Sequence, residues 1–508
     1  MSVSPARTPI WLGFGVLLGV ACTGPYSTTT EANETEIVCP IGSEGCACTP
    51  GGTCDAPLVC ASNYCVSPGA TTGVDSTSTA DATSADSDTL AGGCSPAEDV
   101  ISVDCAEVTP YCNTKGECVG CMGIASCAKV DPARPACDEA SGQCVECTAA
   151  DTAACTGTTP ICDETMSACR ACASHDDCPG SACDLASGAC FPADQALYVD
   201  AAGACDDGDD GSQGAPLCTL KAALARVAQG PKATPRAIRV TGASYPEPLI
   251  VPGGYTVAIV RDGRTAAKLT GKGAESLRID PGARVFLHGL EIRGNTEGHG
   301  VGCSGAELWV EASTVAEHTG GLASAGCTVR LRGAVFHKNS SEGIHADGGE
   351  VTLANTFVSD NGGFAGRGGL ALAGGATASV VYSTFYGNAA PIGLGHSIDC
   401  DPEPPAEALT VRNTIAFNLS GTATFSCDGA EVVTHSAFSA DADDMNDTNL
   451  GLADTQGLLK ADAQRPGVYR PVPGSPLMDL ASFKDGDPER DFDGDARGKT
   501  GFPGADQP

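Results

Sequence analysis

The sequence predicts a mainly β protein: a right-handed parallel β-helix with an N-terminal capping helix, preceded by small disulfide-rich modules and disordered linkers. Three observations lead to this fold class. A sequence motif of apolar, small and Asn residues recurs at steps of about 21 to 30 residues along the second half of the chain. Glycine is frequent, with 65 residues, and aromatic residues make up only 5%, which favours tight turns and short strands. The third observation is the number of cysteines, 29, most of which lie N-terminal to the recurring motif.

The charge of the chain limits its partners. It contains 63 acidic and 29 basic residues, a formal net charge of −34. Such a charge repels nucleic acid and anionic membrane surfaces. We therefore expect no nucleic-acid partner, and contact with a membrane only through a lipid anchor.

The N-terminus indicates export. Arg7 is the only charged residue before a short apolar run (residues 10–20), which is too short for a membrane-spanning helix. The run ends in the letters LGVAC, with Cys22 last, and resembles the lipobox of bacterial lipoproteins, although Gly19 stands where that motif prefers Leu. The resemblance implies a signal peptide at residues 1–21 and acylation of the Cys22 thiol; an ordinary signal peptide is the alternative. We expect an outer-membrane lipoprotein or a protein on the cell surface of a Gram-negative bacterium.

Three short segments follow the signal peptide. Residues 22–38 are rich in Thr, Ser and Glu and have no apolar period, which is typical of a flexible tether. Residues 39–65 contain six cysteines and cannot surround a hydrophobic core, so disulfides must stabilise this small module. Residues 66–93 are a low-complexity linker that cannot fold, because nothing in it can be buried.

Residues 94–193 are Cys-rich repeats with a period of about 25 residues. Equivalent blocks contain Cys112, Cys137 and Cys162, and a shorter block contains Cys183. The blocks look like the Cys-rich repeats in surface proteins of large-genome Gram-negative bacteria. Their Cys-x-x-Cys pairs are also zinc or redox motifs, but export favours disulfides, and the sequence leaves their connectivity open.

The last domain spans residues 194–508. It opens with a strand, a Gly/Asp-rich loop at residues 206–210 and a helical stretch at residues 220–229, which Gly230 closes. This order resembles the N-terminal cap of bacterial β-helix proteins. Such a helix covers the open end of the coil, where strand edges would otherwise be exposed. The remaining cysteines of this opening are Cys205 and Cys218, which we also expect in disulfides.

The recurring motif predicts which residues of successive coils are equivalent. Coils stacked about 4.8 Å apart place equivalent residues directly above one another. Cys303 and Cys327 are separated by about one coil, as are Cys400 and Cys427, so each pair can form a disulfide. Amide side chains suit the following turn, where they tolerate a left-handed backbone and hydrogen-bond along the stack. The expected inward stack is Ile292, Val315, Phe336, Phe357, Phe385, Ile415 and Phe438, and the expected polar ladder is Asn295, Asn339, Asn388 and Asn418.

A β-helix is a common scaffold for polysaccharide lyases and hydrolases, so catalytic residues must be considered. His299 between two glycines resembles the Gly-His-Gly of polygalacturonases, which also need carboxylates on neighbouring coils; the preceding coil offers only Glu291 and Glu297. A calcium-and-arginine site like that of pectate lyases would use Asp347, Asp360, Asp399 and Asp401 with Arg367, but these acids lie at different phases of the coil. The catalytic candidates, none of them complete as a site, are His299, Asp347, Asp360 and Arg367.

Calcium is the one cofactor for which the sequence offers candidate ligands. Asp491, Asp493 and Asp495 alternate around a glycine and could supply oxygen ligands, although the EF-hand pattern is missing. The tail that contains them (residues 474–506) resembles the closing signature of pectin-lyase-like repeat proteins.

The leading functional hypothesis is a non-catalytic surface protein whose β-helix binds polysaccharide or another component of the cell envelope. The alternatives are an extracellular polysaccharide lyase or hydrolase, and a structural envelope protein. An acid pair facing one groove would favour the enzyme, whereas a groove lined with exposed aromatic residues would favour binding.

Overall fold

The computed structural model describes most of the chain after residue 108 and a few short stretches before it. The chain forms two compact units, residues 1–89 and 90–508. The expected signal peptide with Cys22, the expected tether, residues 67–93 of the expected linker and Asp401 lie outside the described residues. So does the 39–65 module, except for the hairpin of β1 (Val59–Ala61) with β2 (Tyr64–Val66). The described residues are 59–61, 64–66, 94, 100–102, 105, 109–362, 367–388, 396–400, 408–418, 424–427, 431–439, 448–452 and 454–508.

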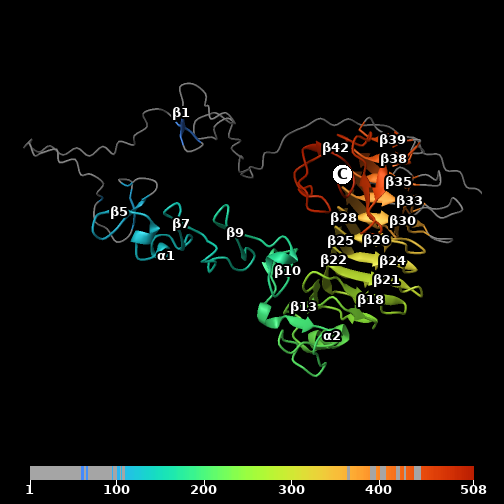
Figure 1. The fold of residues 1–508 in the computed structure, drawn as a ribbon, viewed down its shortest axis with the longest axis horizontal. Helices are drawn as coiled ribbons and strands as arrows, with labels where there is room; N and C mark the ends of the chain where they lie inside the picture. Colours follow the sequence, from blue (N-terminus) through green and yellow to red (C-terminus); the bar gives the residue numbers. More distant parts are fainter. Residues whose placement is uncertain are drawn as a thin grey trace, which may run out of the picture. The chain divides into compact units, whose positions relative to one another are not determined.

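Three parallel sheets wind into a right-handed β-helix, and each coil adds one strand to each sheet (Figure 1). The first sheet consists of β12 (Leu197–Val199), β13 (Arg236–Val240), β16 (Thr256–Arg261), β19 (Arg284–His288), β22 (Glu307–Glu311), β25 (Thr328–Arg332), β28 (Glu350–Ala354), β31 (Thr377–Val381), β34 (Leu409–Arg412) and β37 (Glu431–Thr434). The second consists of β14 (Ser244–Tyr245), β17 (Ala267–Leu269), β20 (Leu290–Arg293), β23 (Thr314–Ala316), β26 (Val335–His337), β29 (Phe357–Ser359), β32 (Thr384–Tyr386), β35 (Ile415–Phe417), β38 (Ala437–Ser439) and β39 (Leu450–Leu452). The third consists of β15 (Leu249–Val251), β18 (Glu275–Ile279), β21 (His299–Ser304), β24 (Gly320–Ala325), β27 (Ile344–Asp347), β30 (Gly368–Ala373), β33 (His396–Cys400) and β36 (Phe425–Ser426).

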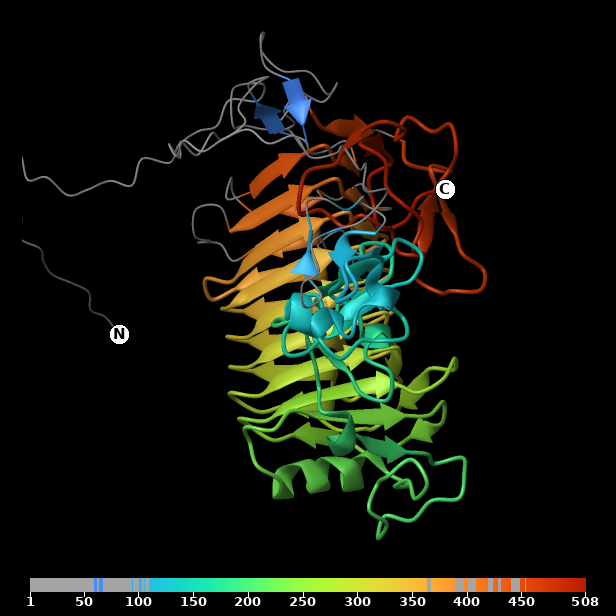
Figure 2. The same cartoon turned by 90° about the vertical axis from the view of Figure 1, so that its left-hand side faces the viewer.

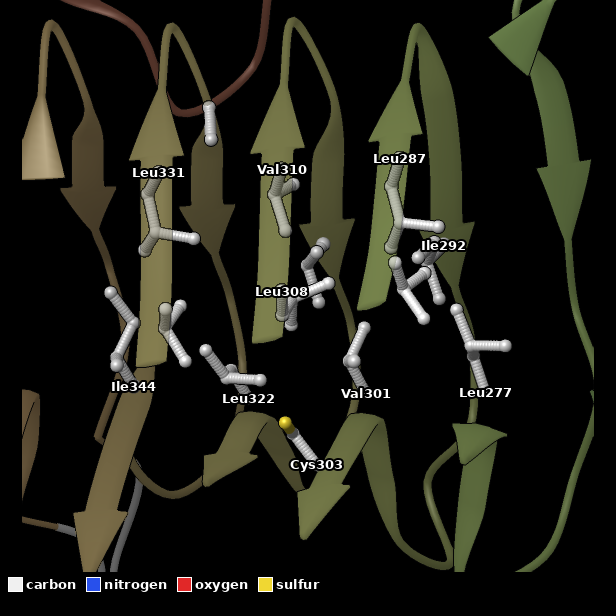
Figure 3. Close-up of a cluster of buried hydrophobic side chains, with 14 of the residues drawn as sticks. Leu277, Leu287, Ile292, Val301, Cys303, Leu308, Val310, Leu322, Leu331 and Ile344 are labelled. Carbon is white, nitrogen blue, oxygen red and sulfur yellow. The ribbon is translucent and has the colours of Figure 1, made fainter. Parts of the chain in front are cut away.

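Stacked aliphatic side chains fill the inside of the coil. Alternate residues of each strand point inward, so Leu287, Val310 and Leu331 of successive coils form one row of the first sheet (Figure 3). Leu277 and Val301 belong to the facing row of the third sheet. Every one of these five side chains is at most 1% exposed. Because each coil repeats the same inward positions, the core continues from one end of the stack to the other.

The register of the second sheet shows that two members of the expected inward stack, Phe357 and Ile415, were predicted wrongly. Its register pairs Phe336 with Val358 and Val358 with Phe385, so Val358 takes the inward position that we predicted for Phe357. Phe357 is nevertheless fully buried, because it packs outside the coil against Val468 and its neighbours. An apolar residue on each face of a strand removes the alternation from which a register is predicted.

Residues 454–508, which we name the C-terminal cover, pack on the outer face of the second sheet. The same register error therefore affects Ile415, which packs outside the coil with Leu477, while Ala416 pairs with Phe385 inside. The cover contains two hairpins, which are formed by β40 (Leu459–Ala461), β41 (Tyr469–Pro471), β42 (Ala481–Ser482) and β43 (Thr500–Gly501).

The amide ladder runs through one residue more than the sequence predicted. The Asn339 Nδ2 donates to Asn361 Oδ1 at 2.8 Å, and the Asn361 Nδ2 donates to Asn388 Oδ1 at 3.0 Å. With Phe357 taken as the inward residue, the ladder position three residues later falls on Asp360, whereas with Val358 inward it falls on Asn361. The error at Phe357 therefore concealed Asn361. All three amides are at most 1% exposed, so each bond satisfies a polar group that would otherwise be buried without a partner.

The capping helix α2 (Leu220–Gln229) lies at one end of the stack, where Figure 2 shows it in green below the first coils. Its buried face contains Leu220, Leu224 and Val227, and the Thr219 hydroxyl accepts the Ala222 N–H at the N-terminus. The Gly/Asp-rich loop also supports this end, because the Asp207 carboxylate accepts the N–H groups of Cys218 and Thr219.

Each Cys-rich repeat is stapled by two crossing disulfides, which join its first cysteine to the third and its second to the fourth. The bonds are Cys94–Cys112, Cys105–Cys118, Cys121–Cys137, Cys127–Cys144, Cys147–Cys162, Cys155–Cys169, Cys172–Cys183 and Cys178–Cys190. Between them lie β3 (Val100–Ile101), β4 (Tyr111–Cys112), β5 (Cys118–Val119), α1 (Cys127–Val130), β6 (Ala136–Asp138), β7 (Gln143–Val145), β8 (Ile161–Asp163), β9 (Ala168–Arg170), β10 (Cys183–Asp184) and β11 (Ala189–Cys190). In the β-helix, the structure joins Cys205 to Cys218, Cys303 to Cys327 and Cys400 to Cys427.

Within the described part of the chain, no helix has the length and apolar character needed to cross a membrane.

Candidate functional site

The catalytic candidates from the sequence do not gather into one site. His299 begins β21, and its ring lies over Gly320 of the next coil, where an added Cβ would come within 2.4 Å of the His299 Nδ1. Arg367 pairs with Asp399 across neighbouring coils, with 3.7 Å between Nε and Oδ2, and burial raises the pKa of Asp399. Asp347 ends β27 on the same third sheet. Of these residues, the structure brings only Arg367 and Asp399 into an ion pair.

Asp360 lies on a different side of the coil. It follows β29 of the second sheet, where its carboxylate accepts the Tyr469 hydroxyl of the C-terminal cover at 2.7 Å. Burial raises the pKa of Asp360. The residue therefore helps to attach the cover, and it is separated from the acids of the third sheet.

Two of the three aspartates considered for calcium, Asp491 and Asp493, already have protein partners for their carboxylates. Asp493 is paired with Arg465 and Arg470, and these two charges lower its pKa. Asp491 accepts the N–H groups of Asp493 and Asp495 and so closes their loop. Two guanidinium groups next to Asp493 oppose the binding of a further cation at this loop.

The last Cys-rich repeat (residues 172–191) packs on the outer face of the first sheet. Phe286 of β19 and Trp309 of β22 stack there with ring centroids 4.7 Å apart, and Phe191 meets Phe286 edge-on at 5.8 Å. The Arg239 guanidinium donates to the Ser181 carbonyl at 3.0 Å. These contacts join the disulfide-rich part of the chain directly to the β-helix.

A pocket of about 770 Å³ lies where the last repeat, the outer faces of the first two sheets and the C-terminal cover meet. We name it the interface pocket. Its carboxylates are Asp176, Glu291, Glu311, Asp491 and Asp493. Its arginines are Arg293, Arg332, Arg465 and Arg490, and its histidines are His288 and His337. The volume is in the range of small-molecule and oligosaccharide-sized sites.

Glu311 is the most perturbed acid in this pocket. It ends β22, and the register places His288 of β19 and Arg332 of β25 beside it on the two neighbouring coils. The residue is 9% exposed, and burial raises its pKa to about 7 against the opposing charge of Arg332. The His288 Nδ1 is 4.0 Å from Glu311 Oε2, and burial lowers the pKa of His288. Near neutral pH, Glu311 can therefore donate or accept a hydrogen bond.

His337 is a second buried titratable group of the pocket. It ends β26 and is 1% exposed. Burial, together with the charges of Arg293 and Lys338, lowers its pKa to about 4. The imidazole is therefore neutral at physiological pH, when it can donate through one ring nitrogen and accept through the other.

Sequence reasoning missed this site. Its residues come from three segments that are far apart in the chain, and none of them forms a known motif. One signal was available: Phe286 and Trp309 are large aromatic residues at positions that the strand alternation assigns to the outer face. Two such residues on successive coils indicate that another part of the chain covers this face.

Comparisons with known proteins identify the fold but no function. Residues 277–443 match the family model "Right handed beta helix region", and residues 81–196 match "Family of unknown function (DUF8331)". The solved structures that resemble the chain include "Crystal structure of pectate lyase Pel9A", with 14% identity over 61% of this chain and 96% of that one and a TM-score of 0.39. Another is "Pectin methylesterase PemA from Erwinia chrysanthemi", with 10% identity over 50% and 92% and a TM-score of 0.33. No curated protein matches the chain.

The C-terminal domain is thus a right-handed parallel β-helix, which the family match and the pairing of its strands both show. Proteins with unrelated functions share this fold, so the fold does not identify a function.

Proposed function

We propose that this chain is a non-catalytic cell-surface protein that binds a polysaccharide segment in the interface pocket. The observation that supports the proposal is the mixture of charges there. The whole chain has 63 acidic and 29 basic residues, whereas five carboxylates and four arginines line the pocket. The lining of the pocket is therefore much closer to charge balance than the chain as a whole.

Such a lining suits sugar hydroxyls. Arginine supplies several hydrogen-bond donors in a fixed geometry, and carboxylates supply acceptors. Neutral His337 and half-protonated Glu311 can each donate or accept a hydrogen bond. Phe492 of the cover also lines the pocket and provides an apolar surface for a sugar ring. Among the described residues, neither Arg332 nor Arg490 has a carboxylate within 4.0 Å for an ion pair. Arg490 Nη1 already donates to the Gly494 carbonyl at 2.8 Å, so Arg332 has the guanidinium that is most available to a ligand.

The placement of this domain outside the cell rests on the lipobox-like sequence that ends at Cys22, together with the disulfide-rich repeats. In this arrangement the lipid anchor holds the N-terminus, the repeats act as a stapled stalk, and the pocket forms where the stalk meets the β-helix.

Binding should be measured by glycan array and then by calorimetry with the glycans that respond. We expect Arg332→Ala to weaken binding about tenfold or more, because it removes a charged donor. Arg278→Ala is the matched control, because Arg278 lies on the third sheet, where it pairs with Asp280. Equal affinity of the Arg332→Ala variant and the wild type would exclude the interface pocket as the site.

The same samples test the enzymatic alternative. A glycoside hydrolase would release reducing ends, and a lyase would form an unsaturated product that absorbs in the ultraviolet. We expect neither from the wild type. Turnover that disappears in Glu311→Gln would show instead that Glu311 acts as a general acid, which its raised pKa would permit.

A further inference from the structure

Three buried side chains converge at the edge of the interface pocket: His175 of the last repeat, and His288 and Glu311 of the β-helix. One ligand atom from each lies within 4.8 Å of the other two. His175 is 1% exposed and Glu311 is 9% exposed. In the described part of the chain, the other clusters with this geometry consist of cysteines, all of which are bonded in disulfides.

Two of the three groups have a polar atom without a partner. His175 Nε2 and His288 Nδ1 are buried, and neither makes a hydrogen bond to the described residues. Buried polar atoms in folded proteins are nearly always paired, so two such atoms side by side indicate that a ligand belongs between them. The ligand must interact with two imidazole nitrogens and a carboxylate, which is a donor set that divalent transition metals prefer.

We propose that His175, His288 and Glu311 bind a zinc ion. Zinc accepts imidazole nitrogen and carboxylate oxygen at about 2.0–2.2 Å in a tetrahedron, so its ligand atoms lie roughly 3.3 Å apart. The three side chains must therefore move together by about 1 Å. His288 and Glu311 line the interface pocket, so the fourth position of the ion faces the pocket and takes water or a ligand oxygen.

One contact opposes the metal. The Cys183 N–H donates to His175 Nδ1 at 3.2 Å, whereas coordination through Nε2 places the ring proton on Nδ1. Binding therefore exchanges that hydrogen bond for a metal bond, which weakens the affinity by roughly ten- to a hundredfold. The affinity of structural zinc sites in proteins is many orders of magnitude larger than this loss. We therefore expect the site to bind zinc with a dissociation constant in the micromolar range or tighter.

The site would join two parts of the molecule. His175 comes from η2 (His175–Asp177) of the last repeat, and the other two ligands come from β19 and β22 of the first sheet. A zinc ion would thus crosslink the stalk to the β-helix beside the stacked Phe286 and Trp309 rings. This inference does not depend on the proposed glycan, because the metal is tested alone.

Isothermal titration with zinc chloride tests the proposal on the full chain, with its disulfides intact and its metals removed by a chelator. We expect about one zinc per chain, and Glu311→Gln and His288→Gln to weaken binding about tenfold or more. His345→Gln is the matched control, because His345 lies on the third sheet beside Glu342. A titration without binding, or binding that both ligand variants leave unchanged, would overturn the proposal.

Hydrogen exchange provides the second measurement. Zinc should slow amide exchange in residues 172–191 of the wild type and have a much smaller effect in Glu311→Gln, because the bound ion adds a link between this repeat and β22 that the variant weakens. Zinc that binds without slowing exchange there would exclude His175 as a ligand and refute the three-residue site.

Discussion

The buried imidazole of His337 predicts a measurable loss of stability in acid. Its pKa falls from 6.5 to about 4 in the folded protein, because the ring is 1% exposed and lies near Arg293 and Lys338. A histidine with a lowered pKa contributes stability that is fully present above pH 6.5. That contribution is lost as the pH falls toward 4, because the unfolded chain then binds a proton that the folded chain resists.

The magnitude follows from these two values. At pH 4.5 the unfolded imidazole is almost fully protonated and the folded one only partly, which lowers the free energy of unfolding by about 2.5 kcal/mol. At pH 7.5 the same difference is close to zero. His337→Gln removes the titration and leaves a polar side chain of similar size.

Urea unfolding at both pH values, followed by the fluorescence of Trp309, provides the assay. Between pH 7.5 and pH 4.5 the wild type should lose about 2.5 kcal/mol more than His337→Gln. His345→Gln, at a partly exposed histidine of the third sheet, should behave as the wild type does. If the wild type and His337→Gln lose the same stability, His337 is not a buried neutral imidazole, and the packing of the cover over β26 is wrong.

Three further predictions concern stability. Phe385→Ala should lower the free energy of unfolding by about 3–5 kcal/mol, because Phe385 is fully buried in the coil; a loss below about 1 kcal/mol in urea unfolding would contradict its inward position. Asn361→Ala should cost about 1–3 kcal/mol, because it leaves its ladder neighbours without partners, and faster amide exchange at the turn would show this. Replacing Cys303 and Cys327 by serine should cost about 3 kcal/mol in thermal unfolding, and an unchanged melting temperature would argue against their bond.

The fold follows from the sequence because its repeat is long and strongly patterned. Stacked positions such as Ile292, Val315 and Phe336 share one environment in every coil, so the same residue types recur at the same phase. The prediction was wrong at Phe357 and Ile415, where both faces of the strand are buried. The alternation of apolar and polar residues along a strand identifies one buried face. It no longer does so when a distant segment of the chain also buries the other face.

The interface pocket illustrates the opposite case. Glu311 looks like any solvent-facing acid of a strand, and its raised pKa arises only when the last repeat and the C-terminal cover enclose it. Those segments are more than a hundred residues away from it on either side. The local sequence pattern contains no information about which segment folds back onto which face of the β-helix. The interface pocket could therefore be found only from the three-dimensional structure.

The crossing disulfides determine how this chain responds to a protease. A cut between the first and last cysteine of a repeat leaves both halves covalently joined, because at least one bridge spans every peptide bond there, as Cys121–Cys137 and Cys127–Cys144 do for the second repeat. Only the short connectors between repeats lack such a bridge, namely residues 119–120, 145–146 and 170–171. Within residues 94–190, separation of the β-helix from the N-terminal part of the chain therefore requires cleavage at one of three connectors, each only two residues long.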